Sequence, residues 1–306
     1  MRVGITGASG LIGTALRRDL EQHGHQVVGF VRRQATAGDR RWDGQHLAAT
    51  DLDGLDAVVH LAGAGVGDKR WSPAYRRVVL DSRVLGTRAV AAATAEAGTP
   101  VLLSASAIGF YGDTGDRLTD ETGPRGAGFL AEVCEAWEAS TAASTARVAH
   151  LRTGVVLSTE GGALRKQLPV FRAGAGAPLG SGKQWLSWIS IRDEVAAIRH
   201  LLTAPVSGPV NLVAPAPVTN AAFTKALGAA LHRPTLPVGV PGFVLRAALG
   251  GFADEALLVG QRLAPSVLQG SGFAFQDSEL GSALERLLGD HGDRPADEVA
   301  LGEPDS

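Results

Sequence analysis

The chain has little of several residue types on which protein chemistry often depends. Its 306 residues include one cysteine, Cys134, one methionine and two tyrosines, and no lysine stands between Lys69 and Lys166. A single cysteine excludes an internal disulfide and cannot by itself form a cysteine metal site, so we expect no bound metal. The net charge of -2 gives no indication of nucleic-acid binding.

Long apolar runs are also missing. No stretch approaches the ~18 consecutive apolar residues of a membrane span, and Met1 and Arg2 lead directly into a strand pattern instead of a signal-peptide layout. We therefore expect a cytoplasmic protein with no nucleic-acid or membrane partner, and its oligomeric state stays open. A hydrophobic content of 45% is enough for a large buried core.

What the chain does contain is a glycine-rich turn at its start, TGASGLIG at residues 6–13. The turn follows the apolar run 3–5 and leads into apolar residues at helical spacing, as a strand-turn-helix unit requires. Gly7, Gly10 and Gly13 let the backbone approach a pyrophosphate, and the helix N-terminus favours its charge. This context predicts a dinucleotide site; the alternative is a glycine turn that only packs a helix on a sheet.

The second strand, predicted over residues 26–31, ends at Arg32 and Arg33. At this position an NAD-binding fold usually carries an acidic residue for the ribose hydroxyls, whereas an arginine accommodates a 2′-phosphate. The sequence offers no acidic residue there, which favours NADP(H) as cofactor. The alternative is that both arginines merely face water.

Strands and helices alternate through the first half of the chain. Further strands are predicted at 56–61, 101–106 and 147–151, with helices at 72–97 and 129–143. This alternation is typical of an α/β fold with a doubly wound parallel sheet, the Rossmann fold, whose ligand site lies at the carboxyl ends of the strands. His60 lies inside a strand, where a hydrogen-bonded core histidine is favoured over a catalytic one.

The pattern loosens after about residue 158. Helical patterns cover 193–202, 219–231, 244–249, 255–263 and 280–288, strand patterns cover 185–191 and 209–212, and the tail from Asp290 is expected to be disordered. GAGAPLGSGK at 174–183 resembles part of a P-loop, but no Ser or Thr follows the lysine and no strand precedes it. We interpret it as a flexible loop near the substrate.

Several strings resemble the extended short-chain dehydrogenase/reductase superfamily: TGASGLIG, HLAG at 60–63, LDSRVLGT at 80–87, SASAIGFYGD at 104–113, LRTGVVL at 151–157 and WISIRDEV at 188–195. DKRW at 68–71, FLAEVCEAWE at 129–138 and GFAF at 272–275 are similar to its atypical epimerase family branch, which is SDR39U1-like with a C-terminal DUF1731-type module. The resemblance implies an NADP-binding Rossmann domain at 1–157 and about 190–213, and a small mixed C-terminal lobe on the substrate side at 158–189 and 214–289.

The resemblance also shows what this chain lacks. The superfamily uses a serine and a Tyr-x-x-x-Lys pair, in which the lysine lowers the pKa of the tyrosine phenol so that it can transfer a proton. Here Tyr75 and Tyr111 are followed four residues later by Val79 and Gly115. Arg83 stands where the superfamily usually has an asparagine.

The remaining catalytic candidates are Ser106, which we prefer to Ser104, and Tyr111, which could equally anchor a loop. Cys134 is expected to be an inert thiol, because no basic residue is close to it in sequence. The residues expected to bind the cofactor are Gly7, Ser9, Gly10, Leu11, Ile12, Gly13, Arg32, Arg33, Leu61, Ala62, Gly63, Arg83, Ser104 and Val155.

Two functions fit these residues. The first is an NADP(H)-dependent oxidoreductase or epimerase-like enzyme that acts on a small polar or carbonyl substrate with a non-standard proton donor. The second is a non-catalytic NADPH-binding sensor or regulatory protein.

Overall fold

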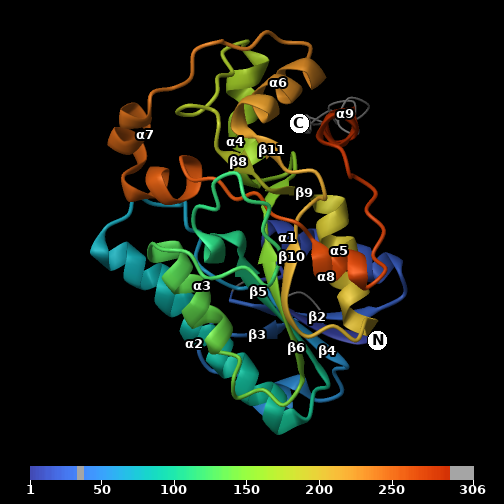
Figure 1. The fold of residues 1–306 in the computed structure, drawn as a ribbon. Coiled ribbons are helices and arrows are strands. Elements are labelled where there is room, and N and C mark those ends of the chain that lie inside the picture. Colours follow the sequence, from blue (N-terminus) through green and yellow to red (C-terminus); the bar gives the residue numbers. More distant parts are fainter. Residues whose placement is uncertain (33–37, 290–306) are drawn as a thin grey trace, which may run out of the picture.

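The computed structural model describes residues 1–32 and 38–289, and a parallel sheet of seven strands forms its centre (Figure 1). The strand order is β10-β6-β5-β4-β1-β2-β3, and each neighbouring pair is parallel. The strands are β1 Arg2–Thr6, β2 Gln26–Val31, β3 Arg40–Arg41, β4 Ala57–His60, β5 Val101–Ala107, β6 Arg147–Thr153 and β10 Gly208–Leu212. The strands are added outward from β1 on both sides, with β2 and β3 on one side and β4, β5, β6 and β10 on the other. This order confirms the doubly wound sheet.

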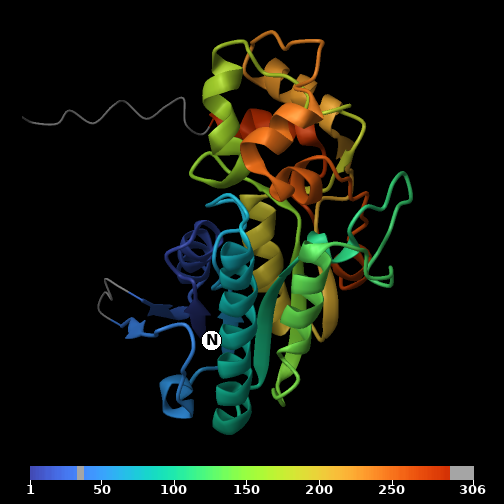
Figure 2. The same ribbon diagram turned by 90° about the vertical axis from the view of Figure 1, so that its left-hand side faces the viewer.

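Helices cover both faces of the sheet. On one face, α1 (Leu11–Gln22) and α5 (Ile191–Thr203) share a core with Val3 and Ile5 of β1. On the other face lie α2 (Pro73–Ala97) and α3 (Phe129–Ala139), which run side by side in Figure 2. Burial of the strands on both faces explains why they read as continuous apolar runs.

The long helix α2 begins and ends where the sequence predicts. The Ser72 side chain accepts a hydrogen bond from the backbone N–H of Tyr75 at 3.1 Å, and Pro73 occupies the first turn. Gly98 ends the helix with φ 66°. A serine cap, an early proline and a left-handed glycine are the strongest local signals for helix ends.

A second core lies above the carboxyl edge of the sheet (Figure 2). Its elements are β7 Val155–Leu157, α4 Gly162–Arg172, β8 Trp185–Leu186, β9 Trp188–Ser190, β11 Val218–Thr219, α6 Asn220–Ala230 and α9 Leu280–Gly289. β7 pairs with β9 and β8 with β11. The domain boundaries stay a prediction, and one segment that they place in the lobe, α8 (Ser266–Gly270), packs beside β10 of the main sheet.

Some expectations for the second half are wrong. The predicted helix at 255–263 is a short π-helical turn, η3 (Ala253–Leu257), followed by an extended segment in which Gln261 bonds to Trp185 and Arg262 to Thr119 through the backbone. Helix α4 was not predicted, since it begins among glycines and contains Pro169. The remaining short elements are η1 Ala49–Leu52, η2 Ile108–Tyr111 and α7 Gly242–Leu249.

Two expectations fall on segments that the structure does not describe. Arg33 lies in 33–37, and the tail from Asp290 lies in 290–306. Among the helices of the described residues, none combines the length and apolar character needed to cross a membrane.

Candidate functional site

The turn between β1 and α1 holds its backbone close to the neighbouring strand. Gly7 has φ 69°, and a β carbon there would lie 2.9 Å from the backbone N of Ala62. A β carbon on Gly13 would overlap the carbonyl oxygen of Gly7. Gly10 is extended, and within the described residues no side chain caps the start of α1. The amides of the first turn are therefore available to an anion, as a phosphate site requires.

Two cavities meet at this turn and together form one cleft. The larger, of about 700 Å³, lies over the ends of β1, β2 and β4, and the smaller, of about 420 Å³, extends over β5 and β6. Both are lined by Gly7, Gly10 and Leu61. Of the residues predicted to bind cofactor, the cleft is lined by Gly7, Ser9, Gly10, Leu11, Ile12, Gly13, Arg32, Leu61, Ala62, Gly63 and Val155. We call this feature the dinucleotide cleft.

The outer end of the dinucleotide cleft carries charges of both signs. Arg32 and Asp43 line the larger cavity and, with Arg41 and His46, an adjoining one of about 420 Å³. The Asp43 carboxylate bonds to the His46 ring at 2.8 Å and accepts the backbone N–H of Gln45 at 2.7 Å. The hydrogen bond to His46 is the main cause that lowers the pKa of Asp43 to about 2. Asp43 could not be placed at this end from the sequence, because it reaches the cleft from the segment after β3.

A buried chain of hydrogen bonds supports the middle of the cleft. Thr6 Oγ1 accepts the N–H groups of Leu61 and Ala62 at 3.2 and 3.3 Å, and it lies 2.7 Å from His60 Nδ1. His60 Nε2 lies 3.0 Å from Thr87 Oγ1. Burial lowers the pKa of His60 to about 4, so the ring is neutral. His60 is confirmed as a hydrogen-bonded core histidine that ties β4 to β1 and α2.

At the inner end, Ser106 forms a network with two charged residues. The Ser106 hydroxyl donates to Glu138 Oε1 at 2.7 Å, and Arg152 donates to both Glu138 oxygens at 2.8 and 2.9 Å. Burial by itself would raise the pKa of Glu138, but the hydrogen bonds from Arg152 and Ser106 outweigh it and the pKa is lowered. Glu138 is therefore an ionised carboxylate that accepts the hydrogen bond of the Ser106 hydroxyl. Ser106 also lines the smaller cavity.

Tyr111 lies behind this network and lines neither cavity. Its hydroxyl donates to Asn211 Oδ1 at 2.7 Å and accepts from Arg152 Nη1 at 2.9 Å. The side chain is 3% exposed, and burial raises the pKa of its phenol. The structure does not bring Tyr111 to the cleft beside Ser106, and this position matches the loop-anchor alternative.

Three other candidates are also held within the protein. The Cys134 thiol faces the carbonyl oxygen of Ala107 at 3.6 Å, and burial is the main cause that raises its pKa to about 11, so it is an uncharged thiol at neutral pH. Arg83 stacks on the Trp137 ring at 4.7 Å and donates to the Ala64 carbonyl at 2.9 Å. Ser104 is fully buried and, like Arg83, does not line the cleft.

A second carboxyl group lies beneath the inner end. Thr153, which lines the smaller cavity, donates its hydroxyl to Glu194 Oε1 at 3.0 Å. Glu194 is fully buried in the first turn of α5, and desolvation raises the pKa of its carboxyl to about 8. At neutral pH, Glu138 is thus ionised and Glu194 protonated, two carboxyls whose surroundings shift their pKa values in opposite directions.

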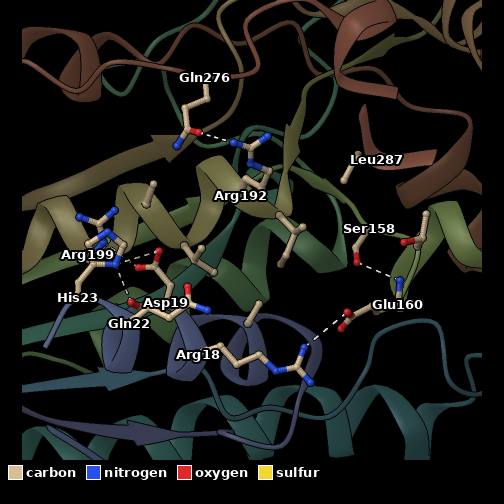
Figure 3. A pocket seen from close by; sticks show the side chains of 15 residues that line it. Arg18, Asp19, Gln22, His23, Ser158, Glu160, Arg192, Arg199, Gln276 and Leu287 are labelled. Carbon is tan, nitrogen blue, oxygen red and sulfur yellow. Dashed lines mark hydrogen bonds and ion pairs between the residues drawn. The ribbon is translucent and has the colours of Figure 1, made fainter. Parts of the chain in front are cut away.

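A further groove of about 520 Å³ lies between α1, α5 and the turn at 158–160 (Figure 3). Its charged side chains are engaged with partners: Arg199 with Asp19 at 2.7 Å, and Arg18 with Glu160 at 3.6 Å. No residue of the glycine turn lines it. The groove is separate from the dinucleotide cleft and presents no convergent set of unpaired groups.

Asp43, Glu138 and Thr153 belong to the site but are not singled out by the sequence. Glu138 had one usable signal, since it ends the string FLAEVCEAWE at 129–138 and follows Cys134 by four residues, which places both on one helix face. Thr153 lies in the string LRTGVVL at 151–157 but was not singled out. Nothing in the local sequence marks Asp43 as part of the site.

Comparison with known proteins agrees with this geometry. Residues 3–213 match the NAD dependent epimerase/dehydratase family, and residues 240–287 match a domain of unknown function, DUF1731. An epimerase family protein of Mycobacterium bovis is 48% identical over 289 residues, which cover 92% of this chain and 96% of the relative. The crystal structure of human SDR39U1 (isoform 2) with NADPH superposes with a TM-score of 0.89 at 34% identity, over 95% of this chain and all of that one. A nucleoside-diphosphate sugar epimerase from Corynebacterium glutamicum gives 0.80 at 38% identity, over 95% of this chain and 58% of that one.

Proposed function

Because this chain belongs to the NAD-dependent epimerase/dehydratase family, we propose that it is an NADP(H)-dependent oxidoreductase or epimerase-like enzyme of the cytoplasm. Its substrate would be a small polar molecule with a hydroxyl or carbonyl group. The observation that carries this proposal is the continuous dinucleotide cleft, which runs from Arg32 past the glycine turn to Ser106. The human relative crystallised with NADPH supports the choice of cofactor.

The residues of the cleft fit a dinucleotide. Gly13 leaves no room for a β carbon, which would overlap the Gly7 carbonyl oxygen. The uncapped start of α1 leaves backbone amides that can bind the pyrophosphate. Arg32 and Arg41 would hold a 2′-phosphate at the outer end. When bound, the nicotinamide would supply or accept a hydride.

The proton would move through Ser106 and Glu138. Since the Ser106 hydroxyl donates its hydrogen bond to Glu138, the lone pairs of Ser106 are left for a donor in the smaller cavity. A substrate hydroxyl would donate to Ser106, and as its carbon loses a hydride, its proton would pass to Ser106 while the Ser106 proton passes to Glu138. In the reverse direction Glu138 would first take up a proton and pass it to Ser106, while Ser106 would give its own proton to a carbonyl oxygen. Ser106 would be the catalytic residue, and Glu138 the acceptor behind it.

Calorimetric titration with NADPH and separately with NADH tests whether the protein binds the cofactor. We expect tight binding with a preference for NADPH. A panel of carbonyl compounds and nucleotide sugars is then added to the NADPH complex while the absorbance of the reduced nicotinamide is followed. Substrate-dependent oxidation is the expected result, and a wild-type protein that binds neither cofactor would overturn the proposal.

Matched serine variants test the relay once a substrate turns over. Ser106→Ala removes the hydroxyl that lines the cleft, and we expect turnover to fall by roughly 10²-fold or more. Ser104→Ala is the control, because Ser104 lies on the same strand but is buried away from the cleft. Equal activity of the two variants would remove Ser106 from the mechanism while leaving cofactor binding intact.

A second candidate is a non-catalytic NADPH sensor. The sensor is supported by the state of the side chains that could replace the absent Tyr-x-x-x-Lys pair. Tyr111 is bonded to Arg152 and Asn211, and the Cys134 thiol is uncharged. A sensor would bind NADPH tightly, turn over no member of the panel and change its conformation or its affinity for a partner.

A further inference from the structure

The C-terminal module, residues 240–287, contributes a segment that contacts two walls of the dinucleotide cleft without lining the cleft itself. This segment, residues 250–257, follows α7 and includes η3; we call it the docking segment. In Figure 1 it lies beside the starts of α2 and α3. Phe252 and Glu255 make its two principal contacts, one on each wall.

Phe252 packs against the loop that follows β4. Its ring lies edge-on to Trp71 at 5.8 Å between centroids, and a β carbon on Gly67 would lie 3.2 Å from the Phe252 ring. Trp71 fixes the same loop from within, because its indole N–H donates to the Val66 carbonyl at 2.8 Å. The residues of this loop that line the larger cavity are Leu61, Ala62, Gly63, Ala64, Gly65, Asp68 and Lys69. Phe252 therefore supports a loop that forms the outer wall of the cleft.

Glu255 caps the helix that carries the inner wall. Helix α3 begins after Gly128, which has φ 104° and no side chain to offer as a cap. Glu255 Oε2 instead accepts the backbone N–H of Leu130 at 2.8 Å. A carboxylate at a helix N-terminus satisfies an otherwise open donor and interacts favourably with the helix dipole. The same helix carries Trp137, which lines the smaller cavity, and Glu138, which bonds to Ser106.

Arg76 of α2 joins these contacts into one cluster. Its guanidinium lies 5.2 Å from the Trp71 ring centroid and 5.0 Å from that of Phe129. A β carbon on Gly251 would lie 3.0 Å from Arg76 Nη2. The docking segment, the loop after β4 and the start of α3 thus pack around a single side chain, so a displacement of one changes the contacts of the others.

We infer that Phe252 and Glu255 are positioning residues of the dinucleotide cleft, and that docking of the C-terminal module and binding of NADP(H) strengthen each other. This inference rests on the proposed function, since it takes the dinucleotide as the ligand of the cleft. Coupling of this kind is reciprocal: if the docked segment raises the affinity for NADPH, bound NADPH must stabilise the docked segment to the same extent. It gives the module a role in cofactor binding that needs no contact with the cofactor.

Hydrogen exchange of the full chain with and without NADPH tests the reciprocal effect. We expect NADPH to slow exchange at residues 4–13, which include the cleft-lining glycine turn, and also at 250–257, which do not line the cleft. A module that serves only as a structural support would show no change at 250–257. Slowed exchange at 4–13 alone would overturn the coupling and leave the proposed function standing, whereas no binding of NADPH would overturn both.

Two phenylalanines of the module provide a matched pair of variants. Phe252→Ala is expected to weaken NADPH binding about five-fold or more, the lower range of typical coupling between sites. Phe243→Ala is the control, because Phe243 lies on α7 with 71% of its surface exposed, and we expect unchanged affinity. Equal affinities of the wild type and a folded Phe252→Ala variant would contradict the inference.

Variants of Glu255 keep the test valid if Phe252→Ala does not fold. Glu255→Gln retains an oxygen that can accept the Leu130 N–H, whereas Glu255→Ala removes it. We expect the alanine variant to lose both NADPH affinity and the exchange effect at 250–257, and the glutamine variant to keep most of both. Wild-type affinity in both variants would overturn the role of Glu255.

Discussion

Ser106 and Glu138 are joined by a hydrogen bond of 2.7 Å in which the serine is the donor. The direction follows from charge, because a carboxylate held by Arg152 has no proton to give. If the Ser106 hydroxyl turned to donate to a carbonyl oxygen, its own lone pairs would face the Glu138 carboxylate. The geometry therefore favours a substrate group that donates to Ser106, such as a hydroxyl.

Removal of the Glu138 charge should destabilise the protein. Glu138→Gln leaves the Arg152 guanidinium, whose side chain is 5% exposed, without its counter-charge. We expect a loss of unfolding free energy on the order of 3 kcal/mol, as found when one partner of a buried ion pair is removed, measured by urea denaturation at pH 7. Glu135→Gln on the same helix is the control: its partner Arg125 is exposed, so the loss should stay below about 1 kcal/mol. Equal losses of unfolding free energy in the two variants would contradict the prediction that the buried ion pair stabilises the protein more than the exposed one.

Glu194 gives a dependence of stability on pH. Its pKa of about 8 in the folded protein lies above the usual value of 4.5. Between these values the unfolded chain releases the proton and the folded chain keeps it, so the stability from this group falls as pH rises, by at most about 1.4 kcal/mol per pH unit. Glu194→Gln removes this titration and retains an acceptor for Thr153. We expect the unfolding free energy of the variant, measured by urea denaturation, to rise relative to that of wild type between pH 5 and pH 8. A difference between the two proteins that stays constant over this range would show that Glu194 is ionised in the folded protein.

Several features of the site could be predicted from sequence because a local pattern determines them. The glycine turn is one, since residues 6–13 hold both the strand-turn-helix context and the close approach of Gly7 to Ala62. The start of α2 is another, because Ser72 and Pro73 act on the backbone next to them. His60 was also predictable, since a histidine within a buried strand has to find partners there, and it does in Thr6 and Thr87.

Other features depend on contacts between distant segments and leave little local trace. Glu255 caps α3 from a segment 125 residues further along the chain, and no pattern around Gly128 indicates where the cap comes from. Asp43 reaches the outer end of the cleft through the path of the chain after β3. The π-helical turn η3 reads as part of a helix, but the backbone groups that follow it pair with Thr114, Thr119 and Trp185, which a sequence pattern does not reveal.

The outer end of the cleft should discriminate between the two cofactors through opposite charges. Arg32→Ala should weaken NADPH binding by roughly ten-fold and NADH much less, because only NADPH carries the 2′-phosphate that an arginine accommodates. Asp43→Asn should have the reverse effect on preference, since the Asp43 carboxylate repels a phosphate and accepts ribose hydroxyls. Calorimetric titration of each variant with both cofactors gives the four affinities. Equal losses of NADPH and NADH in Arg32→Ala would remove the 2′-phosphate assignment.

The glycine turn itself can be tested at Gly10, where both cavities of the cleft meet. Gly10 has φ -78°, which any residue adopts, and a β carbon there would lie 3.2 Å from the Gly7 carbonyl oxygen. The backbone dihedral angles of Gly10 thus accept a side chain with only a small shift of the Gly7 carbonyl, but the side chain would occupy the space that a pyrophosphate needs. We expect Gly10→Val to lose NADPH affinity by about 100-fold or more, with its melting temperature without cofactor close to wild type, and Gly10→Ala to fall between the two. If Gly10→Val melts like the wild type and still binds NADPH with wild-type affinity, the turn does not hold the phosphates, and the dinucleotide must lie elsewhere in the cleft.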